Sequence, residues 1–247
     1  MRIDVITLFP DSYTSALNES VIARARENGI VDLRIVNLRD YTHDRHRTVD
    51  DRPYGGGAGM VMKPEPLFEA VEDLTDAERT RVVLLTPQGT RYTQRLAENY
   101  AGEPHLILIC GHYEGVDERV REALVDEEVS VGDFVMTNGN IAAMMVVDSV
   151  VRLLPGTLGS PASAENESFD ADGLLDYPQY TRPQTFRGMQ VPEVLLSGDH
   201  GQIAGWREDQ RRQRTQARRP DLLEQNKPET QTNNSEHPES STGRREK

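Results

Sequence analysis

The chain has 247 residues and contains little cysteine and no long apolar run. Its single cysteine, Cys110, cannot form an internal disulfide, which excludes a small secreted fold held together by disulfides. The longest apolar runs, 82–85 and 106–110, are far shorter than the roughly 20 residues that a membrane-spanning helix needs. The N-terminal residues also lack the basic segment, apolar core and cleavage site of a secretory signal. We therefore expect a cytoplasmic protein with no membrane partner.

Positive charge is scarce as well. The chain carries 28 Lys and Arg against 41 Asp and Glu, a formal net charge of −13. This balance argues against indiscriminate binding to nucleic acids, because phosphate contacts come from clustered cations. Nearly all the cations are arginine, which binds phosphate with two hydrogen bonds and stacks on bases. Six of them fall on one predicted helix: Arg207, Arg211, Arg212, Arg214, Arg218 and Arg219. The cluster is consistent with a solvated helix face or with an RNA contact.

The hydrophobic pattern of residues 1–159 alternates short strands with helices. Strands are expected at 3–8, 31–36, 82–85 and 106–110, and helices from Asp11 or Ser12 to Gly29 and at 64–74, 92–100, 116–124 and 144–154. Such alternation predicts an α/β fold class with a mainly parallel sheet.

The composition divides the chain into four parts. Residues 1–159 form the expected α/β domain, and the small, polar residues of 160–172 are expected to be an interdomain linker. Residues 173–224 contain small apolar patches and a helix expected at 200–219, which predict a small helical domain. Residues 225–247 contain no large apolar residue, so we expect a disordered tail.

Turn-forming residues follow three successive strands of the α/β domain, at 86–89, 111–115 and 131–140. Ligands of open parallel sheets bind at the carboxyl ends of strands, and glycine there lets the backbone approach a flat ligand. These segments together predict one shared pocket. Other chemistries find less support: the glycine run 55–59 lacks the Gly-Lys-Ser/Thr of a nucleotide-binding loop, and His43 and His46 are too few for a metal site.

Four longer motifs carry a resemblance to a known family. They are residues 42–60, the Cys-Gly-His-Tyr-Glu-Gly-Val-Asp-Glu-Arg-Val of 110–120, the Gly-Leu-Leu-Asp-Tyr-Pro-Gln-Tyr-Thr-Arg-Pro of 173–183, and the Val-Pro-Glu-Val-Leu-Leu-Ser-Gly-Asp-His of 191–200. In this order they resemble the bacterial tRNA (guanine-N1)-methyltransferases over residues 1 to about 224. The family belongs to the SPOUT methyltransferases, in which the α/β domain, with helices on both faces of its sheet, ends in a deep trefoil knot, a rare exception to the usual connection rules.

The resemblance implies a cofactor, a substrate and an assembly. S-adenosylmethionine is expected in the three strand-end loops, on Thr86, Pro87, Gln88, Gly111, Tyr113, Glu114, Val131, Gly132, Asp133, Phe134, Val135, Met136 and Gly139. The substrate is expected to be tRNA, methylated at N1 of the guanosine immediately 3′ of the anticodon by a homodimer. Substrate contacts are expected from Asp50, Arg52, Asp176, Arg211, Arg212 and Arg214.

The resemblance also assigns the proton transfer. Guanine N1 carries a proton, so a carboxylate should remove it while a cation steadies charge at O6. The family base is an aspartate before a Ser-Phe pair; here Glu167 precedes Ser168-Phe169, a departure that leaves Asp170 as the rival carboxylate. The matching cation is Arg152, for which a helix-end cation is the alternative interpretation.

Further departures fall in the third loop. Phe134 stands where the family commonly has Tyr, and residues 138–142 read Asn-Gly-Asn-Ile-Ala instead of a Gly-Gly-Glu-Leu-Pro-like stretch. A divalent cation such as Mg²⁺ fits the family, although no ligand cluster identifies its site. Two alternatives to the methyltransferase remain: a tRNA-binding relative without activity, and a relative that methylates another nucleotide.

Overall fold

The computed structural model describes residues 1–75, 79–159 and 167–225. The chain divides into two compact units between Asn166 and Glu167. The described part of the expected linker, 167–172, thus belongs to the second unit, while 160–166 and residues 226–247 of the expected tail lie outside the described residues. Within the described ranges, no helix has the length and apolarity needed to cross a membrane.

The first unit is built on a five-stranded sheet in which every strand pair is parallel. The strands are β1 (Arg2–Thr7), β2 (Asp32–Asn37), β5 (Thr80–Arg91), β6 (His105–Cys110) and β7 (Glu127–Ser130), in the order β2-β1-β6-β5-β7. This architecture confirms the α/β fold class with a parallel sheet.

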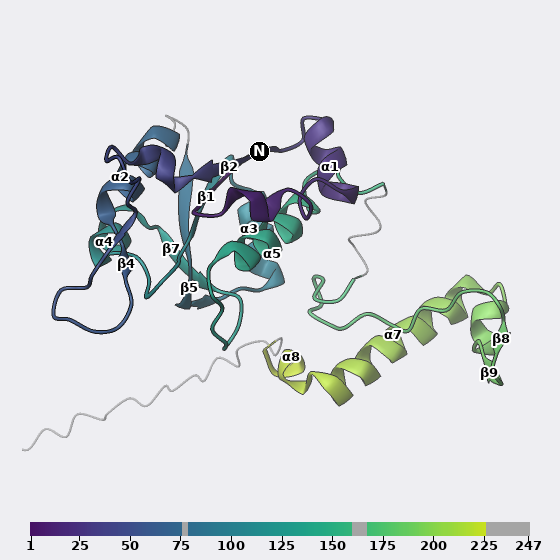
Figure 1. Ribbon diagram of the computed structural model, residues 1–247. Helices are drawn as coiled ribbons and strands as arrows, with labels where there is room; N and C mark the ends of the chain where they lie inside the picture. The colour runs from purple at the N-terminus through teal and green to yellow at the C-terminus, as the bar shows by residue number, and fades with distance from the viewer. Residues whose placement is uncertain (76–78, 160–166, 226–247) are drawn as a thin grey trace, which may run out of the picture. The chain divides into compact units, whose positions relative to one another are not determined.

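Helices cover both faces of this sheet, because alternate strand residues are apolar on both sides. Leu106, Leu108 and Cys110 of β6 pack in one core, and Ile107 and Ile109 pack in a second core on the opposite face. The first core is closed by α1 (Ser20–Glu27), α3 (Gln94–Ala101) and α5 (Asn140–Val151), and the second by α2 (Pro64–Leu74) and α4 (Glu118–Leu124). Figure 1 shows these two helix layers on either side of the strands.

The helix expected from Asp11 or Ser12 to Gly29 is interrupted. A 3₁₀ turn, η1 (Pro10–Tyr13), precedes α1, and no side chain caps η1. The Asn18 side-chain amide donates to the Thr14 carbonyl at 2.6 Å, the acceptor that a continuous helix would give to the Asn18 backbone. Gly29 ends α1 as expected, with φ of 69°.

Strand β5 is longer than its apolar run because it continues beyond a bulge. Its pairing with β7 shifts register between Leu85 and Thr90, so the expected loop 86–89 is the bulge itself. Gly89 lies where β7 passes: a Cβ on it would stand 2.3 Å from the Val129 backbone nitrogen. Only glycine fits this crossing.

Shorter elements complete the first unit beside the strand ends. They are η2 (Leu38–Tyr41) and an antiparallel pair of β3 (Asp50–Asp51) and β4 (Val61–Met62). The Met62 amide donates to the Gly115 carbonyl at 2.9 Å, so β4 runs beside the loop that follows β6.

The second unit contains a hairpin of β8 (Thr185–Phe186) and β9 (Met189–Gln190), a 3₁₀ turn η3 (Glu193–Leu196), and helices α7 (His200–Arg218) and α8 (Pro220–Gln225). Asp199 caps α7 by accepting from the Gly201 and Gln202 amides. The small core of the second unit contains Leu174 and Thr215, and the Thr215 hydroxyl accepts from the Leu175 amide at 2.9 Å. The expected helical domain is therefore organised around one face of α7.

Candidate active site

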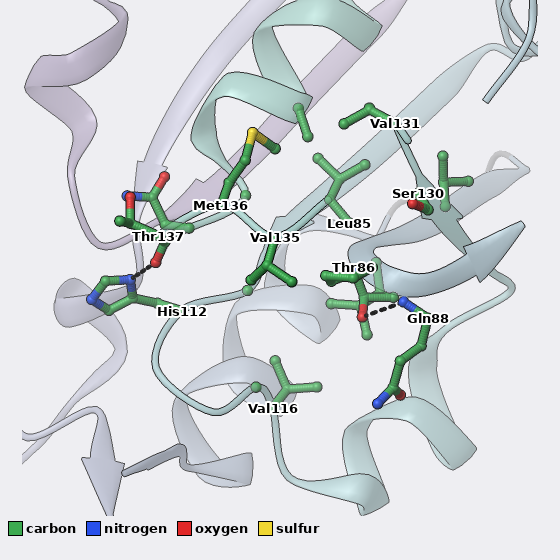
Figure 2. A pocket seen from close by; sticks show the side chains of 18 of the residues that line it. Leu85, Thr86, Gln88, His112, Val116, Ser130, Val131, Val135, Met136 and Thr137 are labelled. Atoms are coloured by element: carbon green, nitrogen blue, oxygen red, sulfur yellow. Dashed lines mark hydrogen bonds between the residues drawn. The ribbon is translucent and has the colours of Figure 1, made fainter. Parts of the chain in front are cut away.

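The carboxyl ends of β5, β6 and β7 enclose a pocket of about 390 Å³ in the first unit. This volume lies within the range of small-molecule sites. Figure 2 shows side chains from all three strand ends facing the cavity, including Leu85, His112 and Val131. The three turn-rich segments singled out in the sequence thus form one site.

Backbone contacts hold two of the pocket loops together. The Gly139 amide donates to the Gly111 carbonyl at 2.8 Å, and a Cβ on Gly139 would lie 2.9 Å from the Cys110 Cα. The His112 ring nitrogen Nδ1 lies 3.0 Å from the Thr137 carbonyl oxygen, a contact drawn in Figure 2. Loop 131–139 is therefore fixed against the end of β6.

Two asparagines hold the end of the same loop. The Asn138 side-chain oxygen accepts from the Asn140 amide at 2.9 Å. The buried Asn140 side chain accepts from the Thr7 hydroxyl at 2.8 Å and donates to Ser12. Asn140 thus anchors the loop to β1 and η1, and Asn138 fixes the backbone of Asn140, so both departures from the family pattern have structural contacts.

The pocket wall combines apolar and polar surface. Leu85, Val116, Val131, Met136 and Ala142 supply aliphatic or thioether groups suited to a flat heterocycle. Polar side chains also line it: Thr86, Gln88, Glu114, Arg121, Ser130, Thr137 and Asn138. Arg121 is held by Glu128 at 2.6 Å and donates to the Gln88 side chain at 2.7 Å, which ties α4 to the bulge of β5.

The loop after β6 joins the pocket to the charged segment 42–60. Tyr113 has a left-handed backbone with φ of 57°, and Glu114 packs against Gly59, where a Cβ would collide with the carboxylate. Burial and the neighbouring Asp50 carboxylate raise the pKa of Tyr113. Asp50, 63 residues away in sequence, is thereby brought to the rim of the pocket.

The cysteine beside the pocket is unreactive. Cys110 is buried beside the Tyr13 hydroxyl, 3.2 Å from it, and burial raises the pKa of the Cys110 thiol to about 12. A thiol with so high a pKa is not a nucleophile near neutral pH. In the described ranges, no three His, Cys, Asp or Glu side chains are grouped to hold a metal ion.

Every residue expected to bind cofactor lines this pocket except Asp133. Sequence reasoning missed Ser130, Arg121 and the side chain of His112, which also line it. Ser130 ends β7, so its position at a strand end was an available signal. Arg121 reaches the pocket from a neighbouring helix, which no local pattern reveals.

Comparison with known proteins identifies the family. The family model described as tRNA (Guanine-1)-methyltransferase matches residues 1–225. The chain belongs to this family. Among curated proteins named tRNA (guanine-N(1)-)-methyltransferase, it is 56% identical over 226 residues to that of Geobacillus kaustophilus, covering 91% of this chain and 92% of that protein. It is 59% identical over 226 residues to that of Moorella thermoacetica, covering 90% of each.

The two residues expected from the resemblance to take part in proton transfer lie in different units. Arg152 follows the last turn of α5 as its C-cap and is half-buried. Glu167 is the first described residue of the second unit and is also half-buried. The rival Asp170 is occupied: its carboxylate accepts from Arg211 at 2.5 Å, and both side chains are less than 10% exposed.

The expected substrate-binding residues differ in their surroundings. Arg52 is exposed beside β3, and the Asp176 carboxylate accepts from the Tyr177 amide at 2.7 Å and from Gln179. Arg211 lies inside its unit rather than on the surface where we expected it. Arg212 is exposed but paired with Glu208 at 2.8 Å, whereas Arg214 has no carboxylate partner among the described residues.

Proposed function

We propose that this protein transfers the methyl group of S-adenosylmethionine to N1 of guanine in tRNA. The observation that carries the proposal is the pocket formed by three strand-end loops in a chain that matches the tRNA (Guanine-1)-methyltransferase family over residues 1–225. The curated relatives are named as methyltransferases that act on guanine N1 of tRNA. We further propose the guanosine immediately 3′ of the anticodon as the target.

The pocket fits the proposed cofactor. Aliphatic side chains such as Leu85 and Val131 suit the adenine ring, and the backbone of 86–88, 111–115 and 131–139 supplies hydrogen-bonding groups. The Glu114 carboxylate suits a ligand that carries positive charge. S-adenosylmethionine would supply an electrophilic methyl group on a sulfonium.

The residues of the chain then have to make guanine N1 nucleophilic. We propose that Glu167 accepts the N1 proton and that Arg152 balances the negative charge that develops toward O6. Glutamate keeps the carboxylate of the family's aspartate on a side chain longer by one methylene. Asp170 is the rival base, and its carboxylate holds the guanidinium of Arg211.

We propose a homodimeric assembly and a cytoplasmic location. In such a dimer, the segment after residue 159 of one subunit closes over the cofactor pocket of the other subunit. The base in that segment then reaches the cofactor. We also propose that the end of the α/β domain forms a trefoil knot. Its support is the close passage of loop 131–139 along the end of β6 and of β7 beside Gly89, where no Cβ fits.

Nucleoside analysis tests the proposed function. The protein is incubated with an unmodified tRNA transcript and S-adenosylmethionine, and the digested nucleosides are identified by mass spectrometry. We expect 1-methylguanosine, located next to the anticodon by fragment mapping. A methylated nucleoside at another position would support the relative with a different target. Demonstrated cofactor and tRNA binding with no product would support the silent tRNA-binding relative. A requirement for Mg²⁺ is tested by adding a chelator to the same assay.

A further inference from the structure

The arginines of the second unit fall into two groups. Arg211, Arg212 and Arg219 are each paired with a carboxylate, at 2.5 to 2.8 Å. In contrast, five arginines have no carboxylate partner among the described residues: Arg182, Arg187, Arg207, Arg214 and Arg218. Positive charge available to a ligand therefore lies around residues 182–207 and at Arg214 and Arg218, and not on Arg211 and Arg212.

Exposed aromatic and thioether side chains lie around three of these arginines, Arg182, Arg187 and Arg207. Phe186 is 55% exposed, Met189 65% and Tyr180 49%. The Arg187 guanidinium lies 5.2 Å from the centre of the Phe186 ring. We call Tyr180, Arg182, Phe186, Arg187, Met189 and Arg207 the aromatic–arginine face.

The β8–β9 hairpin presents part of this face in a fixed geometry. Phe186 and Met189 are directly paired across the hairpin. The two residues between them, Arg187 and Gly188, have φ of 50° and 79°, as the tightest hairpin turns require. The hairpin lies near the end of α7 where His200 begins the helix (Figure 1), and both side chains of the pair are exposed.

A cavity of about 840 Å³ adjoins the hairpin within the second unit. Its apolar wall includes Val191, Leu195 and Ile203, and its polar groups include Gln184, Arg182 and Arg207. Arg207 also lies 4.7 Å from the Tyr177 ring centre, and Tyr180 lies 6.5 Å from the Trp206 ring. The site combines a broad apolar surface with unneutralised guanidinium groups.

We infer that the aromatic–arginine face binds unpaired nucleotides of the RNA substrate, with bases on Phe186, Met189 and the adjoining cavity and with phosphates on Arg182, Arg187 and Arg207. Single-stranded RNA presents flat apolar faces and one negative charge per nucleotide, and proteins bind it by stacking and by arginine contacts. Two carboxylates nearby in sequence are engaged elsewhere, since Asp199 caps α7 and Glu208 holds Arg212, whereas Glu193 and Asp209 are exposed to solvent. The inference rests on the proposed tRNA substrate. It moves the main expected RNA contact from Arg211 and Arg212 to the aromatic–arginine face.

Trp206 allows a direct test, because it is the only tryptophan of the chain and borders the face. The full-length protein is titrated with unmodified tRNA transcript while Trp206 fluorescence is recorded, at several salt concentrations and without methyl donor. Phe186→Ala should raise the Kd about fivefold or more, the usual effect of losing one stacked base. The double variant Arg182→Gln/Arg187→Gln should flatten the dependence of log K on log salt by roughly 0.7 to 0.9 for each arginine.

Two further variants are matched controls. Arg24→Gln removes an exposed arginine from α1 of the first unit, and Arg212→Gln removes a paired one from α7. Both should leave the Kd within about twofold of wild type. Circular dichroism and the Trp206 emission of the free variants check that each is folded.

Three results would overturn the inference. One is an unchanged Kd and salt slope in Phe186→Ala and the double variant. A second is weakened binding in Arg212→Gln alone. A third is a Phe186→Ala or double variant whose oligomeric mass, measured by light scattering, differs from wild type while its RNA affinity is unchanged. That result would make the face an interface between copies of the chain. If tRNA binds through this face but 1-methylguanosine never forms, the inference stands and the proposed function fails.

Discussion

Glu167 is the residue on which the proposed chemistry depends most. The Ser-Phe motif predicts that it stands at the position of the family's base, but with a longer side chain, and Asp170 follows three residues later. In the structure Asp170 is already bound to Arg211, whose guanidinium also lies 3.7 Å from Glu208. We therefore expect the two carboxylates to have different tasks: Glu167 is the proposed base, and Asp170 holds Arg211 within the second unit.

Glu167→Gln should lower turnover by about 10²–10⁴-fold, because glutamine keeps the size of the side chain but cannot accept the N1 proton. The affinity for S-adenosylmethionine, measured by calorimetry, should barely change. Asp170→Asn is the paired variant, with its stability measured by urea unfolding. Loss of turnover in a stable Asp170→Asn, together with an active Glu167→Gln, would transfer the role of base to Asp170.

Arg211→Met should destabilise the second unit by about 3–5 kcal/mol, because it leaves the buried Asp170 carboxylate without its partner. Trp206 lies in this unit, so urea unfolding followed by its fluorescence reports the change. The control is Arg212→Met, which removes an exposed pair with Glu208 and should cost less than about 1 kcal/mol. Equal effects of the two variants would contradict the structural role of Arg211.

At the level of elements, the pocket is formed by loops that follow β5, β6 and β7 and that are held in place by contacts with these strands. Loop 131–139 is joined to the end of β6 through Gly139 and His112, and the bulge of β5 passes β7 at Gly89. Most of these contacts involve backbone atoms. The position of the loops therefore depends on close backbone approach more than on the identity of the lining side chains.

Gly139→Ala should displace loop 131–139, because its Cβ would lie 2.9 Å from the Cys110 Cα and 3.1 Å from the Gly111 nitrogen. We expect the affinity for S-adenosylmethionine, measured by calorimetry, to fall at least about tenfold. A loss of about 1.4 kcal/mol in binding free energy is enough to give that factor. Gly159→Ala is the matched control, because nothing lies within 4 Å of a Cβ there. Wild-type affinity in Gly139→Ala would show that the loop does not need this contact.

Local signals predicted the elements better than their contacts. Helix α2 matches the predicted range 64–74 because an apolar repeat and Pro64 mark it within a few residues. The prediction of one continuous first helix was wrong. The Asn18 side chain donates to the Thr14 carbonyl, which would accept from the Asn18 backbone amide in a continuous helix. The ion pair of Asp170 with Arg211 joins residues 41 apart, and no periodicity encodes such a pairing. The strand-end rule found the pocket, but Arg121 reaches it by tertiary packing alone.

At the level of the whole molecule, the proposed base and the proposed cofactor pocket lie in separate compact units. A homodimer is the proposed solution, in which the segment of one subunit serves the pocket of another. Light scattering of the active protein should therefore give about twice the 27.8 kDa mass of the chain. A fully active species with the mass of one chain would contradict the shared site. Diluting the protein while following activity provides a second measurement, because dissociation should reduce the activity per chain.

The strand order has a further consequence for synthesis of the protein. Strand β1 lies between β2, about 30 residues later in the chain, and β6, about a hundred residues later. At a synthesis rate of roughly 5–20 residues per second, β1 leaves the ribosome many seconds before β6, which pairs with one of its edges, has been synthesised. The pocket cannot form until Gly139 has emerged as well. During this interval the nascent chain exposes an unpaired apolar strand, so its production depends on protection from aggregation before any ligand can stabilise it.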